Sequence, residues 1–136
     1  MTCSSAYHAI GVSLFMVASV AWSQQSNEST IHRHTSMGTE VLIRAHAEWN
    51  SACMTHEPPG ITITEAPEHG RIDLRPGDAP LGSNYVGDTN CEGRVGRGIQ
   101  VIYLPNAAFR GSDGVTYEVH YHKGSVRTIH VEISVD

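Results

Sequence analysis

The chain has 136 residues, with 9 Lys and Arg against 14 Asp and Glu, so its formal net charge at pH 7 is -5 with histidine neutral. This acidic balance argues against nucleic-acid binding, because proteins that bind nucleic acids use a surplus of basic side chains to neutralise phosphates. The length fits one domain with short extensions, since a domain typically takes about 100–150 residues. Histidine is unusually frequent, with nine residues, whereas Lys123 is the only lysine.

The first 23 residues contain no Asp, Glu, Lys or Arg, and an apolar run extends from Ala9 to Trp22. The run is too short for a membrane span, which needs roughly 18 or more apolar residues. It ends at Ala21-Trp22-Ser23, which fits a small-x-small cleavage site. We therefore predict three segments: a signal peptide over 1–23, a flexible polar leader over 24–38 and a domain over 39–136. A buried N-terminal helix is the alternative for the first segment. The exported product is expected in the periplasm or outside the cell, without a membrane span.

Residues 41–49 alternate between apolar and polar side chains, which is typical of a half-buried strand. In such a strand Arg44, His46 and Glu48 face outward. The apolar face is expected to consist of Val41, Ile43, Ala45, Ala47 and Trp49. A helix is the alternative for this segment, because Ala, Leu, Arg and Glu are good helix formers.

Short strands are predicted over 61–64, 71–74 and 99–104, where apolar and β-branched residues lie between turn residues. The stretch 75–98 between them is rich in glycine and proline and is predicted to be irregular. Loops of that length are uncommon in compact domains, so we expect this one to be pinned or to have a role.

The clearest alternation lies in residues 115–121 and 129–135, which we predict to be two neighbouring strands. A three-residue loop of Lys123, Gly124 and Ser125 keeps the apolar residues on one face, and Gly124 can adopt a positive φ there. This register pairs Val119 with Ile129, Tyr117 with Val131, Glu118 with His130 and His120 with Thr128.

The mature chain thus shows about six or seven short strands and no persuasive helix, which predicts an all-β fold, a β-sandwich. Of the three cysteines, Cys3 leaves with the signal peptide. Cys53 and Cys91 remain and are expected to form a disulfide, as two cysteines in an oxidising compartment usually do. A reactive thiol or a metal ligand is the alternative, which no neighbouring motif favours.

The most specific local pattern lies between residues 103 and 119. Pro105 turns the chain, and Phe109 can plug the end of the sandwich. Gly111 permits a backbone bend closed to other residues, and Asp113 can cap the turn with its own side chain. In full the pattern reads Tyr103-x-Pro105-Asn106-x-x-Phe109-x-Gly111-x-Asp113-x-x-x-Tyr117-x-Val119.

This pattern resembles the repeat of bacterial Ig-like and cadherin-like domains found in tandem adhesins, with Val115 where the repeat usually has Phe. Upstream, Pro67-x-His69-Gly70-x-Ile72 resembles the turn that often precedes the repeat. The resemblance covers residues 67–135 and implies an Ig-like Greek-key sandwich. Such domains serve as spacers, adhesins and binding modules, usually in long arrays, whereas this chain carries one copy.

Three histidines are predicted on the outer face of the last two strands. His120 and His122 project from the same face, and His130 lies on the neighbouring strand near Glu118. Imidazoles in this arrangement can bind Cu²⁺, Zn²⁺ or Ni²⁺. The alternatives are ordinary solvated positions on a sheet, or an interaction surface that becomes cationic below about pH 6.5.

No catalytic set is evident, since there is no Gly-x-Ser-x-Gly motif and Ser112 and Asp113 lie in a structural turn. We expect an exported, non-catalytic Ig-like domain without a cofactor, which acts as a binding or structural module for a protein or surface ligand. The alternative is a periplasmic copper- or zinc-binding protein that uses His120, His122, His130 and Glu118.

Overall fold

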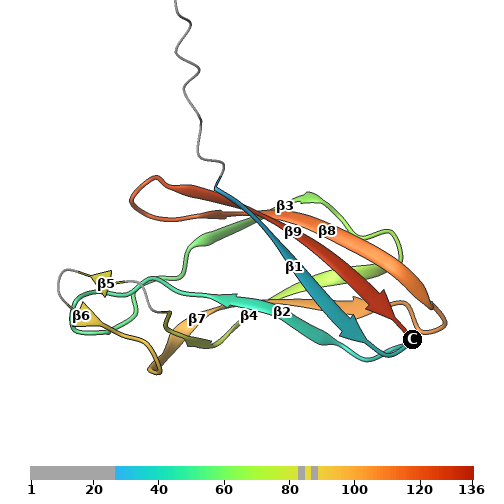
Figure 1. Ribbon diagram of the computed structural model, residues 1–136, viewed down its shortest axis with the longest axis horizontal. Coiled ribbons are helices and arrows are strands. Elements are labelled where there is room, and N and C mark those ends of the chain that lie inside the picture. Colours follow the sequence, from blue (N-terminus) through green and yellow to red (C-terminus); the bar gives the residue numbers. More distant parts are fainter. Residues whose placement is uncertain (1–26, 83–84, 87–88) are drawn as a thin grey trace, which may run out of the picture.

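The computed structural model describes residues 27–82, 85–86 and 89–136, which form two large β-sheets packed face to face (Figure 1). These residues contain no helix, and therefore none that is long and apolar enough to cross a membrane. The predicted signal peptide and the first residues of the predicted leader lie outside the described residues. The fold confirms the predicted all-β sandwich with one disulfide.

Within the described residues, seven strands build the two large sheets. The first sheet has the order β1 (Glu28–Thr35), β9 (Val126–Val135), β8 (Gly111–His120) and β3 (Gly60–Glu65). The second sheet has the order β2 (Val41–His46), β7 (Val95–Pro105) and β4 (Gly70–Pro80). A small hairpin lies between β4 and β7 and consists of β5 (Tyr85–Val86) and β6 (Thr89–Asn90). Neighbouring strands are antiparallel except β1 and β9, which run parallel.

Apolar side chains from the facing surfaces of the two sheets fill the space between them. Tyr103 and Tyr117 are the largest of the fully buried side chains. Buried and exposed residues alternate along most of β9, because successive side chains of a strand point to opposite faces of the sheet. The buried members of this core are Ile31, Ile43, Val101, Tyr103, Val115, Tyr117, Val119, Ile129, Val131, Ile133 and Val135.

The expectation of a flexible leader does not hold for Glu28–Thr35, which forms β1 at the edge of the first sheet. The inward positions of β1 are Ser29, Ile31, Arg33 and Thr35. Only Ile31 among them is apolar. The side chains of β1 therefore alternate between buried and exposed positions, but apolar and polar residues do not alternate in its sequence. Pairing with β9 places this strand within the sandwich, which begins before residue 39.

Arg33 of β1 closes the side of the sandwich where the edge strands β1 and β2 face each other. Its Nε donates to the carbonyl oxygen of Ile43 at 2.9 Å and to that of Leu42 at 3.2 Å. Unpaired carbonyl groups on an edge strand are a template for pairing with another chain. The guanidinium group therefore covers the edge of β2 and links the two sheets.

Residues 41–49 contain the predicted strand instead of a helix, but a β-bulge between Leu42 and Arg44 interrupts its alternation. The extra residue of a bulge shifts the faces of the strand that follows. As a result His46, which was predicted to face outward, is buried. Its Nε2 lies 2.9 Å from the hydroxyl oxygen of Tyr117 in the core.

Part of the stretch predicted to be irregular, 75–98, belongs to the long hairpin of β4 and β7. β4 continues through Pro76, and β7 already begins at Val95. Proline has no backbone N–H to donate, but an edge strand such as β4 tolerates it. Gly98 allows close packing, since a Cβ there would lie 2.4 Å from the carbonyl oxygen of His46. Gly96 and Gly98, which suggested a loop, therefore let chain segments approach each other.

The tight turn within the connection between β8 and β9 has three residues, as predicted, but lies one position earlier in the chain. It consists of residues 122–124, because the N–H of Tyr121 donates to the carbonyl oxygen of Ser125. Gly124 has a φ of 85°, which agrees with the positive φ predicted for it.

The shifted loop changes the pairing between β8 and β9. The predicted pairs of Val119 with Ile129 and of Glu118 with His130 are wrong. The observed pairs include Val115–Val131, Thr116–His130, Tyr117–Ile129, Glu118–Thr128 and His120–Val126. Each partner has moved by two residues, so every side chain keeps its predicted face of the sheet.

Candidate functional site

The residues of the sequence pattern around Asp113 meet at one end of the sandwich. Asp113 accepts four hydrogen bonds, from the hydroxyl of Tyr103 at 2.8 Å and from the N–H groups of Glu68 and His69 at 3.0 Å and Gly114 at 2.9 Å. One carboxylate therefore caps its own turn and fastens the connection between β3 and β4 to the start of β8.

The electrostatics of this end follow from its hydrogen bonds. Burial raises the pKa of Asp113, but the hydrogen bonds from Tyr103 and three backbone N–H groups outweigh it and hold that pKa below its ordinary value. Burial and the bond to Asp113 raise the pKa of Tyr103. Phe109 stacks on His69 with ring centroids 4.1 Å apart, and Gly111 has a φ of 134°. These contacts are those of a structural joint between strands.

The predicted metal-binding residues take part in separate contacts. His120 and Glu118, on the outer face of β8, lie in contact with Nε2 and Oε2 3.1 Å apart. The imidazole of His122 instead contacts Glu48, in the segment that follows β2. His120 and His122 are therefore engaged by carboxylates of different segments, β8 and the segment after β2.

His130 lies with its Nδ1 3.2 Å from the hydroxyl of Thr116, which donates to Glu65 at 2.7 Å. Within the described residues, no three His, Cys, Asp or Glu side chains are grouped so that they could hold a metal ion. Other histidines also lie beside carboxylates, as in the pairs His32–Glu132, His34–Asp136 and His69–Glu68. In a chain with a single lysine, histidine supplies much of the surface pairing with acids.

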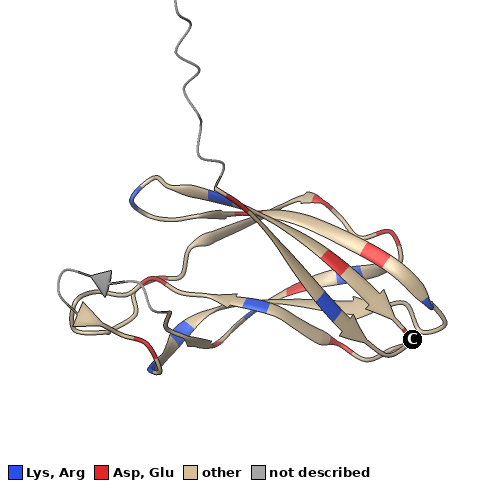
Figure 2. Ribbon diagram, in the orientation of Figure 1, with Lys and Arg blue, Asp and Glu red and all other residues tan. Residues whose placement is uncertain are grey.

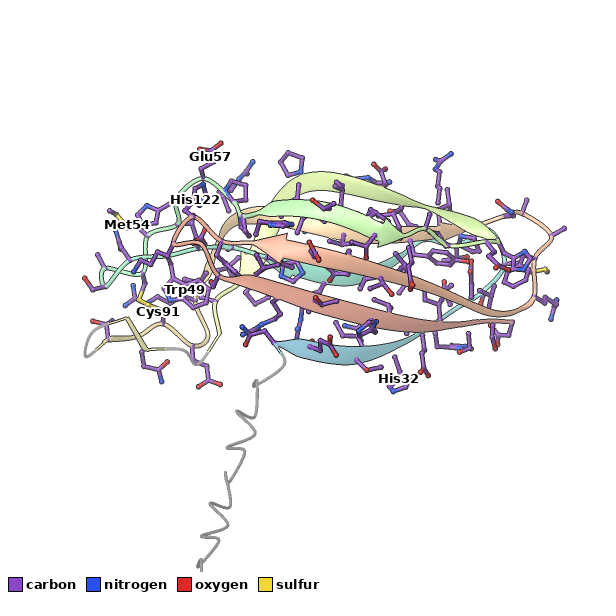
Figure 3. The ribbon with its side chains drawn as sticks, turned by 90° about the horizontal axis from the view of Figure 1, so that it is seen from above. His32, Trp49, Met54, Glu57, Cys91 and His122 are labelled. Carbon is purple, nitrogen blue, oxygen red and sulfur yellow. A yellow bond between two sulfur atoms is a disulfide. The ribbon has the colours of Figure 1, made fainter. Side chains whose placement is uncertain are left out.

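The opposite end of the sandwich contains the disulfide between Cys53 and Cys91, which confirms the predicted pairing (Figure 3). The bridge joins the connection between β2 and β3 to the residue that follows β6. A second and smaller apolar cluster surrounds it, and Figure 3 shows Trp49 beside Cys91. The cluster consists of Ala45, Ala47, Trp49, Cys53, Ala79, Leu81 and Cys91.

Asn50 organises the loop that carries Cys53. Its Oδ1 accepts hydrogen bonds from the N–H of Ala52 at 2.9 Å and of Met54 at 3.1 Å, and its carbonyl oxygen accepts one from Cys53 at 2.9 Å. Cys53 has a φ of 59°, in the left-handed region that non-glycine residues seldom adopt. The hydrogen bonds and the disulfide together hold this loop in one conformation.

Thr55 fastens the same loop to β7. The N–H of Arg97 donates to its hydroxyl at 3.1 Å, and a Cβ on Gly96 would lie only 2.1 Å from its methyl carbon. The residues next to this contact, Met54 and Val95, each keep 62% of their surface exposed. Two apolar side chains are therefore held in solvent on adjoining segments.

The loop between β8 and β9 completes this end of the molecule. Glu48 accepts a hydrogen bond from the backbone N–H of His122 at 3.2 Å in addition to the contact with its ring. The carbonyl oxygen of Glu48 accepts another from the N–H of His56 at 3.0 Å. Three loops are thus joined here, and we refer to residues 50–57, 91–95 and 122–124 as the loop platform.

The sequence alone did not indicate the loop platform. Its two cysteines predicted that the segments around Cys53 and Cys91 meet. The exposure of Met54 and Val95 depends on how loops distant in sequence pack against one another, which no local pattern reports.

No protein-family model matches the chain, and no curated protein is significantly similar to it. The resemblance of the pattern around Asp113 to bacterial Ig-like repeats therefore stays a prediction.

Proposed function

We propose that the chain is an exported, non-catalytic binding domain whose loop platform recognises a protein partner. The observation that carries this proposal is the exposure of Met54 and Val95, at 62% each, on a loop held by the Cys53–Cys91 disulfide and at the start of β7. Apolar surface gains about 25 cal/mol for each Å² removed from water, so a partner that covers these side chains is stabilised.

The bracing of the platform favours binding because it reduces the entropy lost on association. Each flexible side chain or loop residue ordered by a partner costs about 0.5–1.5 kcal/mol. The disulfide, the smaller apolar cluster and the hydrogen bonds of Asn50 already fix the backbone beneath Met54. Methionine also suits such a surface, since its flexible, polarisable side chain adapts to a partner.

Charged residues of both signs accompany the apolar pair at this end of the sandwich (Figure 2). Arg94 and Lys123 supply exposed cations, and Glu57 and Glu92 supply exposed carboxylates. Protein interfaces commonly combine an apolar centre with a polar rim of this kind.

The compartment and the family resemblance support the same role. The disulfide is compatible with an oxidising location outside the cytoplasm. The signal peptide predicted over 1–23 supports export to the periplasm or the cell exterior. The resemblance to the repeats of bacterial adhesins supports recognition as the task of the exported domain.

A comparative capture experiment tests the proposal. The full chain is immobilised and exposed to the extracytoplasmic fraction of the cells that make it, beside the variant Met54→Asp/Val95→Asp. The control is Leu42→Asp/Leu74→Asp, which places the same two charges on exposed apolar residues of strands outside the platform. We expect a protein that the native chain and the control both retain, and whose Kd rises at least about tenfold for the platform variant.

Equal capture by the platform variant and the native chain would contradict the proposal. So would the absence of any protein that the native chain retains above the platform variant. Urea unfolding of all three chains shows whether a loss of capture reflects a loss of folding.

A further inference from the structure

A cavity opens on the side of the sandwich where the edge strands of the two sheets face each other. Along most of this side β1 covers β9, and Arg33 bridges β1 to β2. The first described pair of β1 and β9 is Glu28 with Thr128. Arg127 of β9 precedes this pair and therefore has no partner residue in the described part of β1. A cavity of about 210 Å³ lies there, lined by residues that include Arg44, His46, Trp49, Pro80, Tyr121 and Arg127.

Two arginines of opposite sheets converge on this cavity. Arg44 belongs to β2 and Arg127 to β9, and within the described residues neither forms an ion pair with a carboxylate. Glu48, the carboxylate that follows β2, is occupied by His122. The cavity therefore has a positive potential that the described part of the chain does not neutralise.

The pKa of buried His46 is affected by the same two positive charges. Burial, together with the positive charges of Arg44 and Arg127, lowers the pKa of its imidazole to about 4. The ring is neutral at pH 7 and is held by the hydroxyl of Tyr117. His46 therefore adds no charge to the cavity, and the two guanidinium groups dominate it.

The remaining wall is apolar and aromatic. Trp49, Pro80 and Ala47 line the cavity, and Tyr121 lies half-buried at its edge. The indole Nε1 of Trp49 is buried and has no hydrogen-bond partner among the described residues.

We propose that this cavity binds a small organic carboxylate. The carboxylate lies between Arg44 and Arg127, because guanidinium groups recognise carboxylates through paired, charge-assisted hydrogen bonds. The apolar body of the acid packs against Trp49 and Pro80. The cavity is smaller than the roughly 300–1,000 Å³ of sites for drug-sized ligands, so the acid has about the size of benzoate. The proposal stands apart from partner binding by the loop platform.

Titration with benzoate tests this proposal. The full chain carries Trp22→Phe, so that Trp49 is the only tryptophan and its fluorescence reports on the cavity. Benzamide serves as the neutral analogue, and N-acetylphenylalanine presents a carboxylate as the end of a peptide does. Calorimetry of the unsubstituted chain with benzoate provides a second measurement.

We expect saturable binding of benzoate that weakens at least about tenfold in Arg44→Gln and in Arg127→Gln. The control Arg110→Gln removes the same charge at the opposite end of the sandwich and should bind as the native chain does. Benzamide should bind at least about tenfold more weakly than benzoate. Binding of N-acetylphenylalanine equal to that of benzoate would assign the site to peptide carboxyl ends, and weaker binding would assign it to free acids.

No saturation by benzoate below about 10 mM in either measurement would overturn the proposal. It would also be overturned if both arginine variants bound benzoate as the native chain does. The platform variant Met54→Asp/Val95→Asp should keep its affinity for benzoate, so failure of this proposal and failure of the partner-binding proposal are distinguishable.

Discussion

Asp113 accepts hydrogen bonds on both carboxylate oxygens, Oδ1 from Glu68 and Gly114 and Oδ2 from His69 and Tyr103. We predict that Asp113→Asn lowers the free energy of unfolding by about 2 kcal/mol, since an amide nitrogen then faces other donors. Urea unfolding at pH 7 measures this change.

The matched control is Asp78→Asn, which changes an exposed carboxylate without a side-chain partner among the described residues. It should alter stability by less than about 0.5 kcal/mol. The pKa of Asp113 is lower in the folded chain than in the unfolded chain, so its contribution is complete above about pH 4 and disappears as the pH falls through the folded-state pKa. A difference between the native chain and Asp113→Asn that stays constant into strong acid would contradict this assignment.

His46 makes the free energy of unfolding depend on pH in a higher range than Asp113 does. Burial, with the charges of Arg44 and Arg127, lowers the pKa of His46 from 6.5 to about 4 in the folded chain. The unfolded chain therefore takes up a proton that the folded chain refuses, and stability falls as the pH decreases from about 6.5 toward 4. We predict that the native chain loses about 2 kcal/mol more than His46→Gln between pH 7 and about pH 4.5.

Urea unfolding at several pH values measures this difference, and glutamine keeps a polar group within reach of Tyr117. The control is His56→Gln, which removes an exposed histidine. It should follow the pH dependence of the native chain. Parallel profiles for His46→Gln and the native chain would show that His46 takes up its proton equally in both states.

At the scale of elements, the sequence predicts those strands whose inward residues are apolar. β9 presents Ile129, Val131 and Ile133 to the core, so its period of two is visible in the sequence. β1 presents only Ile31 among polar neighbours, and its position depends on backbone pairing with β9. The bulge in β2 cannot be recognised in the sequence, because apolar and polar residues alternate regularly across it. The bulge changes which of these residues face the core without any change in that alternation.

The contribution of β1 can be measured by truncation. A chain of residues 39–136, the domain expected from the sequence, loses the burial of Ile31 and the cover of the β9 edge. We predict that it is less stable than a chain of residues 27–136 by at least about 2 kcal/mol, and that it self-associates through the exposed edge. Urea unfolding and size-exclusion chromatography with light scattering measure both effects. Equal stability and equal size of the two chains would show that β1 contributes little to the sandwich.

At the scale of the whole molecule, the candidate site follows from the sequence only in part. The cysteine count predicts the bridge between Cys53 and Cys91, because two cysteines leave one pairing. His120 and His130 of the predicted metal site keep their face of the sheet, whereas His122 lies in the turn after β8. Glu118 and Glu48 engage His120 and His122 separately. The cavity beside Arg44 and Arg127 depends on where β1 begins and on the bulge in β2, and neither is encoded in a local pattern.

The disulfide and the main core stabilise different parts of the molecule. The main core lies between the sheets, whereas the bridge and the smaller cluster lie beneath the loop platform. The bridge spans a sequence separation of 38, for which the loss of chain entropy in the unfolded state gives about 4 kcal/mol. We predict that Cys53→Ala/Cys91→Ala lowers the free energy of unfolding by about 2–5 kcal/mol in urea, while Cys3→Ala leaves it unchanged.

Hydrogen exchange separates a global effect from a local one in the bridge-free variant. If the bridge acted only on the unfolded chain, every amide that exchanges by global unfolding would lose the same protection. The bridge and the smaller cluster join the segment that carries Arg94 to the rest of the platform. We therefore expect the amide of Arg94, which donates a hydrogen bond to the carbonyl oxygen of Cys91, to lose more protection than that of Val101. Uniform loss at both amides would mean that the platform folds and unfolds with the sandwich. A larger loss at Arg94 would mean that the disulfide keeps the binding surface ordered in the native state, which its proposed role requires.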